Sequence, residues 1–301
     1  MLALRPLFLA ALASLFGGIG PILPEPLPAQ ETKSGPLAEY VRQPDPSYQW
    51  KKLGEGSVGS AHYTELLLTS QKWRDILWKH QLFVIVPKHV DPKARHAVLM
   101  ISGGQWMSKL EESGPRAEPT GELNQLAVLA SRLSEPVALL LQVPFQPLFN
   151  RSEDALIAYT FDNYLTTGDA SWPLLLPMVK SAVRGMDAVQ AFAKEESSLD
   201  IQKFTVAGIS KRGWTTWLTG AVDGRVAGIV PIVIDVLNMK PHAQLEMESF
   251  GRYSEQVNDY TQYRLQERMD TPRGQALRRI VDPFSYLKSL TMPKLLMMGT
   301  N

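Results

Sequence analysis

One stretch, from Phe204 to Trp217, constrains the fold more than any other part of the chain. Its first six residues are apolar and include three β-branched side chains, which is typical of a short buried strand. From Lys211 onward the composition is that of a helix start. Ser210 stands at the junction, with Gly208 two residues before it and Gly213 three after it. This order predicts a nucleophile elbow, in which a sharp strand-to-helix turn exposes a serine beside the first N–H groups of the helix.

The stretch departs in one respect from the usual elbow pattern, Gly-x-Ser-x-Gly. Arg212 occupies the place of the second glycine, and Gly213 comes one residue later. The alternative is an ordinary strand-to-helix turn of an α/β protein, with Ser210 as the helix N-cap. The surrounding sequence favours the elbow, because the other features that could serve a site also follow predicted strands.

The rest of the chain alternates between predicted strands and helices. Two adjacent strands come first, at residues 60–70 and 78–86, and predict an antiparallel start to the sheet. The later segments are buried strands at residues 96–102, 136–142, 226–234 and 294–298, and helices at residues 121–133, 174–195 and 238–277. We therefore expect an α/β fold of the α/β-hydrolase type. Its sheet would be mostly parallel, with flanking helices and a helical cap inserted at about residues 238–280.

The expected ligand-binding edge of such a sheet lies beyond the carboxyl ends of its strands. Two backbone N–H groups at this edge could stabilise an oxyanion, those of Lys211 and Gly104. Gly104 belongs to a glycine pair that follows the strand at residues 96–102, and this pair could also be a simple tight turn. Gln105, which comes next, and Trp214 are candidates for contact with a substrate.

The acid and base of a catalytic triad are harder to place. In this fold the chain order is serine, acid, histidine. Asp235 ends a predicted strand and is a weak candidate for the acid. His242 follows Ser210, but it lies in the predicted cap beside a proline, so we expect it at the surface or the pocket rim. The other four histidines precede Ser210.

Two cations, Lys211 and Arg212, stand directly beside the predicted nucleophile. They favour an anionic substrate or a developing oxyanion, and Arg212 is a candidate for substrate binding. The alternative is that both are paired with nearby acids such as Asp169 or Asp235. The charged and aromatic segments 151–162 and 167–173 could line a pocket, although Glu153 and Asp154 within the first fit an ion-pair layer better.

Composition limits the classes of function. The 301 residues carry a net charge of +1, and no basic run is interleaved with aromatics, which argues against nucleic-acid binding. There are no cysteines, and no His/Asp/Glu spacing predicts a metal site, so we expect neither a metal nor a cofactor. Glycine pairs here do not form the Gly-x-Gly-x-x-Gly of a dinucleotide-binding fold.

The N-terminus has the features of a secretory signal peptide. A short positive segment containing Arg5 precedes an apolar run at residues 7–19, and small residues lead to a cleavage site near Ala29. We therefore expect a signal peptide at residues 1–29, a hydrolase-like domain at residues 30–301, and a secreted or periplasmic protein with no stable membrane span. An uncleaved N-terminal anchor is the alternative.

Several longer motifs resemble the PhoPQ-activated pathogenicity-related proteins. They are Arg151-Ser-Glu-Asp-Ala-Leu-Ile-Ala-Tyr-Thr160, Trp172-Pro-Leu-Leu-Leu-Pro-Met178, Ser210-Lys-Arg-Gly-Trp-Thr-Thr-Trp-Leu218, Val233-Ile-Asp-Val-Leu-Asn-Met239 and Val281-Asp-Pro283. The resemblance runs from about residue 40 to residue 301 and implies export and an α/β-hydrolase-like fold. It also implies an acidic residue, further helix and strand, and a late histidine after residue 301. The chain is thus expected to be C-terminally incomplete and to show weak or no turnover by itself. The elbow alone is similar to that of glucuronoyl esterases, which carry a basic residue after the nucleophile.

These observations predict an exported serine hydrolase of esterase or peptidase type, with Ser210 as the nucleophile. Its substrate would be a small molecule or a peptide, and the cations Lys211 and Arg212 beside Ser210 favour an anionic one. The alternative is a secreted binding or signalling protein, related to virulence, that keeps the hydrolase fold without catalysis.

Overall fold

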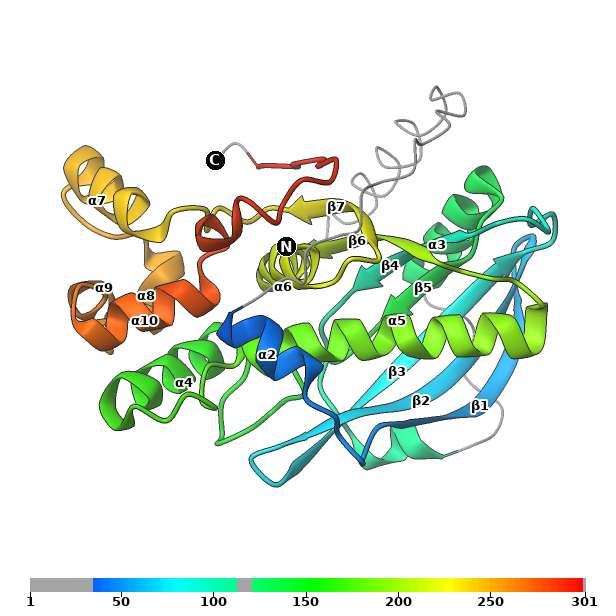
Figure 1. Ribbon diagram of the computed structural model, residues 1–301, viewed down its shortest axis with the longest axis horizontal. Helices are drawn as coiled ribbons and strands as arrows, with labels where there is room; N and C mark the ends of the chain where they lie inside the picture. The colour runs from blue at the N-terminus through cyan, green and yellow to red at the C-terminus, as the bar shows by residue number, and fades with distance from the viewer. Residues whose placement is uncertain (1–34, 113–120, 300–301) are drawn as a thin grey trace.

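The computed structural model describes residues 35–112 and 121–299 (Figure 1). The predicted signal peptide at residues 1–29 and the last two residues, Thr300 and Asn301, lie outside the described residues. In the part that is described, no helix combines the length and the apolar character needed to cross a bilayer.

The described strands form one seven-stranded sheet in the order β1-β2-β3-β5-β4-β6-β7. Their bounds are β1 Gln49–Val58, β2 Ala61–Trp73, β3 Ile76–Pro87, β4 His96–Ile101, β5 Val137–Leu140, β6 Lys203–Ile209 and β7 Val226–Ile232. The first three strands are antiparallel, and β3 also pairs antiparallel with β5. From β5 through β4 and β6 to β7 the pairing is parallel. This mixed, mostly parallel sheet with an antiparallel start confirms the predicted fold class.

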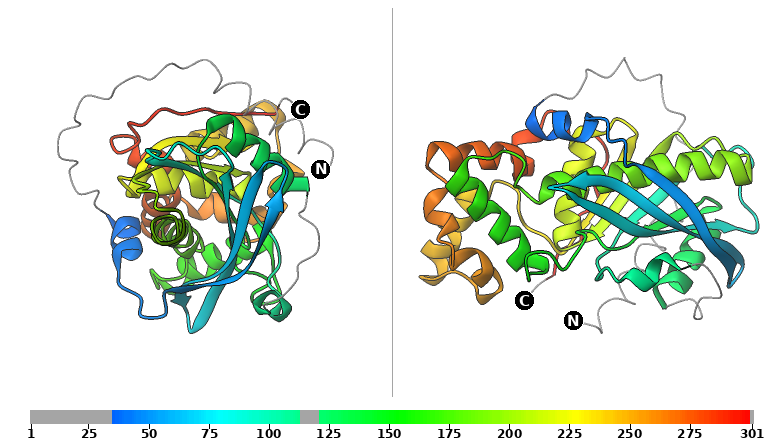
Figure 2. Two further views of the ribbon diagram at one scale, coloured as in Figure 1. Left: turned by 90° about the vertical axis from the view of Figure 1, so that its right-hand side faces the viewer. Right: turned by 90° about the horizontal axis from the view of Figure 1, so that it is seen from below.

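Helices cover both faces of the sheet, as Figures 1 and 2 show. On one face, α5 (Leu175–Ser197) packs beside α6 (Lys211–Val222), and α2 (Pro36–Arg42) lies against both. On the other face, α3 (Gly121–Leu133) packs on the strands through its buried leucines. Two apolar clusters result, one on each side of the sheet. Because β4, β6 and β7 are parallel, their carboxyl ends lie together at the same edge of the sheet, the edge that the strand ends form.

A group of short helices gathers at this edge, around α4 (Glu153–Thr167) (Figures 1 and 2). It consists of α7 (Met239–Phe250), α8 (Asn258–Thr261), α9 (Leu265–Arg268) and α10 (Pro272–Val281). Helices α8, α9 and α10 all contact α4. Tyr260 fixes this packing by donating a hydrogen bond to Asp154 Oδ1 at 2.9 Å. We refer to α7–α10 as the cap helices.

Several segments differ from the sequence prediction, and the helix predicted at residues 238–277 is divided among α7, α8, α9 and α10. Strand β1 was not predicted, because it is an edge strand in which polar residues and glycines interrupt the apolar pattern. Helix α4 was not predicted as a helix. Its buried residues at positions 157, 160, 161, 164 and 165 recur at helical spacing, but Thr160 and Tyr164 put polar groups on this face and interrupt the apolar pattern. Residues 294–298, predicted as a strand, make only isolated bridges to β7, at Ile229–Lys294 and Ile232–Met297.

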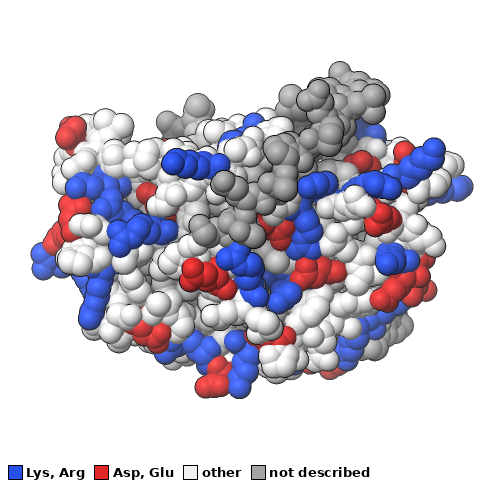
Figure 3. Space-filling model, in the orientation of Figure 1, with Lys and Arg blue, Asp and Glu red and all other residues white. Residues whose placement is uncertain are grey.

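Charged side chains are interspersed on the face shown in Figure 3, with basic and acidic groups side by side. This mixing agrees with a net charge of +1. Association of this face with a partner would therefore depend on local contacts rather than on a field of one sign.

Candidate active site

Ser210 occupies a strained turn between β6 and α6. Its φ of 57° and ψ of −126° lie outside the regions that most residues other than glycine adopt. The turn is held from both sides, because the Ser210 N–H donates to Ile232 O at 2.8 Å and the Ser210 carbonyl accepts the Trp214 N–H at 3.1 Å. The first N–H groups of a helix have no partner within it, so those of α6 remain available near the serine.

Two glycines allow the strand and helix of the elbow to approach this closely. A Cβ atom on Gly208 would lie 2.5 Å from the Arg212 carbonyl oxygen. A Cβ atom on Gly213 would lie 2.6 Å from Ile234 Cγ2 and 3.0 Å from the Gly208 carbonyl oxygen. Gly213 therefore makes the close contact with β6, which explains how Arg212 can stand at the usual position of the second glycine.

The Arg212 side chain is buried behind the elbow and joins four segments. Its Nε donates to Val143 O at 2.6 Å, and Nη1 and Nη2 bind the two carboxylate oxygens of Glu153 at 2.7 Å each. The guanidinium also lies against Gly103, where a Cβ atom would collide with it. One side chain thus links α6 to α4 and to the loops after β4 and β5. This placement directs Arg212 to Glu153 rather than to the cavity described below.

Glu153 is held in place to bind both Arg212 and Lys211. Its N–H donates to Gln146 Oε1 at 2.8 Å, and its carboxylate accepts from Gln146 Nε2 at 2.6 Å. Lys211 Nζ lies 3.0 Å from Glu153 Oε2 and 2.8 Å from Asp154 Oδ2. Burial alone would raise the pKa of Glu153, but Arg212, Gln146 and Lys211 outweigh it and lower the pKa to about 2.

The two cations beside Ser210 are therefore paired, with Glu153 and Asp154 rather than with Asp169 or Asp235, and Glu153 and Asp154 form ion pairs as their segment predicted. Lys211 and Arg212 both bind residues at the start of α4. Asp169 instead binds Arg74 at 2.8 Å, and Asp235 lies 3.5 Å from His242. The sequence could not show these pairings, because Arg212 and Glu153 are 59 residues apart.

The loop after β4 carries the other predicted oxyanion donor, Gly104. Gly104 has a φ of 126°, a conformation that favours glycine. Its carbonyl accepts from Gln146 Nε2 at 3.3 Å, and the Gly103 carbonyl accepts the Gln142 N–H at 3.1 Å. The loops after β4 and β5 are thereby fixed to each other. Gln105 follows with an exposed side chain and is not among the residues that line the cavity.

A cavity of about 390 Å³ opens in front of Ser210, between the elbow, α4 and the cap helices. Ser210, Lys211 and Trp214 line it from the elbow side, and Asp235 and His242 from the segment after β7. Trp214 is 3% exposed, and its Nε1 donates to Val281 O at 2.6 Å. Its ring packs edge to face on Phe161 with 5.9 Å between centroids. Trp214 thus forms a fixed apolar wall of the cavity.

Asp235 and His242 lie at the rim of this cavity. His242 Nε2 is 3.5 Å from Asp235 Oδ2, and their side chains are 42% and 55% exposed, respectively. Within residues 35–112 and 121–299, no hydrogen bond joins His242 to the Ser210 hydroxyl. The same described residues contain no cluster of three or more His, Asp or Glu that could hold a metal ion.

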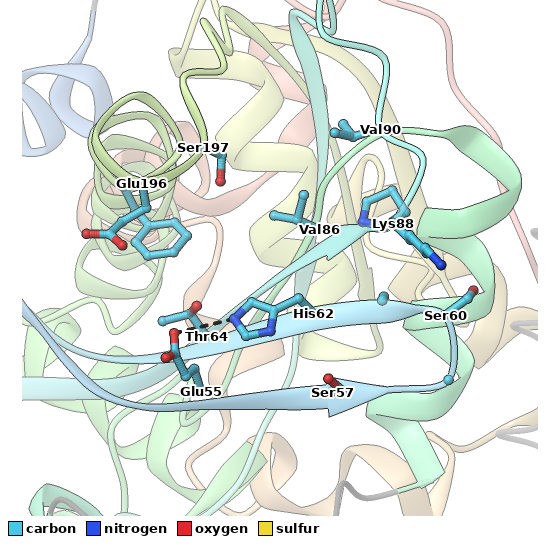
Figure 4. Close-up of a pocket in the computed structure, with 14 residues that line it drawn as sticks. Glu55, Ser57, Ser60, His62, Thr64, Val86, Lys88, Val90, Glu196 and Ser197 are labelled. Atoms are coloured by element: carbon cyan, nitrogen blue, oxygen red, sulfur yellow. Dashed lines mark ion pairs between the residues drawn. The ribbon is translucent and has the colours of Figure 1, made fainter.

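A second hollow, of about 540 Å³, lies at the opposite edge of the sheet (Figure 4). His62 and Glu55 point toward each other there, with 3.4 Å between Nε2 and Oε2. None of the residues predicted for the site lines this hollow. Of these two hollows, the one at Ser210 is lined by the serine with the strained backbone and by the start of α6, whereas Gly104 is not among its lining residues.

The mixed sheet, its flanking helices and the strained serine between β6 and α6 define an α/β-hydrolase fold. Residues 37–301 match the sequence profile of the PhoPQ-activated pathogenicity-related proteins. The chain belongs to this family, as its motifs predicted.

Among curated proteins, the chain is similar to autocrine proliferation repressor protein A of Dictyostelium discoideum. The two are 37% identical over 273 residues, which are 86% of this chain and 53% of that protein. The chain thus spans about half the length of this relative.

Among solved structures, it is similar to an acetyl xylan esterase from Paenibacillus sp. R4, with a TM-score of 0.51, 13% identity and coverage of 88% and 85% of the two chains. A glucuronoyl esterase from Solibacter usitatus overlaps with a TM-score of 0.46, 13% identity and coverage of 87% and 86%. At 13% identity, the likeness to the acetyl xylan esterase shows the fold alone.

Proposed function

We propose that the protein is a serine hydrolase of esterase or peptidase type, with Ser210 as the nucleophile. The observation that carries this proposal is the strained Ser210 turn, with φ at 57°, at the wall of a cavity. Strain of this kind persists only where the surrounding structure enforces it, and it is concentrated at functional sites. The buried contacts of Gly208, Gly213 and Arg212 enforce it here.

The proposed reaction is acyl transfer through a covalent intermediate. Ser210 Oγ attacks the carbonyl carbon of the substrate, and a general base takes the hydroxyl proton. The Lys211 and Gly104 N–H groups donate to the oxygen that becomes negatively charged, and each is worth about 2.7–4 kcal/mol of barrier. The bond to the leaving alcohol or amine then breaks, and the leaving group receives the proton. Water then attacks the acyl carbon while the general base takes its proton, the bond to Ser210 Oγ breaks as Oγ regains a proton, and the carboxylic acid is released.

Export is part of the same proposal. The charged start, the apolar run at residues 7–19 and the small residues before Ala29 support a cleaved signal peptide. The mature protein would be secreted or periplasmic. Sequencing the N-terminus of the protein recovered from its producing cells tests this directly, and a chain that still begins at Met1 would contradict it.

A non-catalytic role in binding or signalling is the second candidate function. Two observations favour it: no described histidine is bonded to Ser210, and the Dictyostelium relative is called an autocrine proliferation repressor. Ser210→Ala separates the two functions. A biological activity that survives this substitution but is lost when the cap helices are disrupted would favour binding.

The experiment that tests the hydrolase proposal is acylation by p-nitrophenyl acetate. We expect the full-length protein to release nitrophenol and to gain one acetyl group on the peptide that contains Ser210. Ser210→Ala should reduce the rate by about a thousand-fold or more. The matched control is Ser57→Ala, since Ser57 is exposed on β1 outside the cavity at Ser210. Equal rates for wild type and Ser210→Ala would refute the proposal.

A further inference from the structure

The charged side chains that line the cavity at Ser210 have partners within the chain. Lys211 binds Asp154 at 2.8 Å, and Lys240 binds Asp270 at 3.0 Å. The other charged groups of the lining are also engaged: Arg278 lies 3.7 Å from Asp270, Asp235 lies 3.5 Å from His242, and Glu246 accepts the Ser254 N–H at 2.8 Å. A charged ligand would have to compete with these contacts.

The balance of charge in the lining does not favour an anion. Among the described residues, three cations face four acids, namely Lys211, Lys240 and Arg278 against Asp154, Asp235, Glu246 and Asp270. With His242 neutral, the formal charge of the lining is therefore −1. An anionic group would gain no net attraction on entering, and it would lose its hydration.

Apolar side chains form part of the remaining lining, beside the polar side chains of Gln244, Tyr253, Gln256, Tyr260 and Gln266. Trp214 is 3% exposed, Leu265 1% and Met269 9%, and all three line the cavity. Val236 and Met239 extend this surface at the start of the cap. A volume of about 390 Å³ falls in the range of pockets that bind small organic molecules.

We infer that this cavity binds an uncharged, predominantly hydrocarbon group of the substrate, next to the bond that Ser210 attacks. The inference rests on the proposed hydrolase function and specifies its substrate class. It replaces the expectation, drawn from the sequence, that Lys211 and Arg212 select an anion. Burial of hydrocarbon against Trp214 and Met269 is the source of binding energy, because the cations are neutralised by α4.

The test of substrate class compares esters that differ in one half at a time. One series lengthens the acyl half, from p-nitrophenyl acetate to hexanoate, and a second lengthens the alcohol half of an acetate ester. We expect kcat/KM to rise at least about ten-fold along one of the two series, which also shows the half that occupies the cavity. A p-nitrophenyl ester of a dicarboxylic acid, which carries a free carboxylate, should react more slowly than its uncharged counterpart of equal length. An unchanged kcat/KM along both series, or a faster reaction of the anionic ester than of its uncharged counterpart, would overturn the inference.

A binding measurement keeps this inference separate from catalysis. N-phenyl-1-naphthylamine is an uncharged apolar probe that fluoresces on leaving water, and we expect it to bind wild type and Ser210→Ala alike. Met239→Trp should weaken binding at least about five-fold by filling the cavity. Leu245→Trp is the control, because Leu245 lies on the same helix but is 60% exposed and outside the lining. Equal probe binding by all four proteins would contradict the inference. A wild-type protein that binds the probe but does not hydrolyse the esters would instead contradict the proposed function.

Discussion

Arg212 and Glu153 form a bidentate ion pair directly behind the candidate nucleophile, with both nitrogen–oxygen distances at 2.7 Å. The pair connects the elbow helix to α4, and Arg212 Nε continues the connection to the Val143 carbonyl. The Arg212 side chain is 10% exposed, so the Glu153 carboxylate compensates a largely buried positive charge.

Glu153→Ala should destabilise the protein by about 3 kcal/mol, because it leaves the Arg212 guanidinium buried without its carboxylate. Urea unfolding at neutral pH measures this change. Asp154→Asn is the matched control, since it weakens the Lys211 contact but leaves the Arg212 pair intact. We expect that control to cost about 1 kcal/mol or less. Equal losses of unfolding free energy in the two variants would show that the Arg212–Glu153 pair stabilises the protein no more than the Lys211–Asp154 pair does.

Acid should remove the stabilisation that Glu153 provides. Its folded-state pKa of about 2 lies below the ordinary value of 4.5, so the contribution is complete above pH 4.5 and is lost as the pH falls toward 2. Glu153→Gln should therefore flatten the pH dependence of the unfolding free energy in that window. Glu248→Gln, at an exposed position on α7, should leave the dependence as in wild type.

A second pH window belongs to His80, which lies within β3 and is fully buried. His80 Nε2 lies 3.0 Å from Ser70 Oγ and Nδ1 lies 3.1 Å from Leu141 O. Burial lowers the pKa of His80 from 6.5 to about 4, against the opposing effect of backbone hydrogen bonds. The folded state thus favours neutral imidazole, and its contribution to stability is lost as the pH falls from 6.5 to 4. His80→Asn should abolish the dependence of the unfolding free energy on pH between 6.5 and 4. His89→Asn, at an exposed position, should keep this dependence.

Gly208→Ala should disrupt the elbow. The added Cβ would lie 2.5 Å from the Arg212 carbonyl oxygen, so backbone must shift, at a cost of about 1–3 kcal/mol. We expect the reaction of Ser210 with p-nitrophenyl acetate to slow by at least about ten-fold. Gly121→Ala is the control, because no atom lies within 4 Å of a Cβ placed there. Wild-type rates in Gly208→Ala would argue against a strained, catalytic turn.

His242→Ala should leave the acylation rate of Ser210 within about three-fold of wild type. The reason is that His242 faces Asp235 at the cavity rim and is 42% exposed, as expected for a rim residue. The measurement is the release of nitrophenol in a single turnover. A loss of a hundred-fold or more, shared by Asp235→Asn, would instead assign His242 as the general base and Asp235 as its orienting acid.

The sequence predicted those parts of the fold that depend on continuous apolar runs. Strand β4, predicted at residues 96–102, spans His96–Ile101, and α3 spans Gly121–Leu133 as predicted. It did not predict α4, since Thr160 and Tyr164 place polar groups on the buried face of this helix and interrupt the apolar pattern. The junction between β6 and α6 also followed from local sequence. The pairing of Lys211 and Arg212 did not, because it depends on how α4 packs behind the elbow.

Covalent labelling by an uncharged alkyl fluorophosphonate examines whether Ser210 is an activated nucleophile. The folded full-length protein and Ser210→Ala would be treated in parallel, digested, and mapped by mass spectrometry. We expect a single modified peptide, which contains Ser210, in the wild type and no modification in Ser210→Ala. Folded wild-type protein that stays unmodified, or label that persists on Ser210→Ala, would contradict the assignment of Ser210 as the nucleophile.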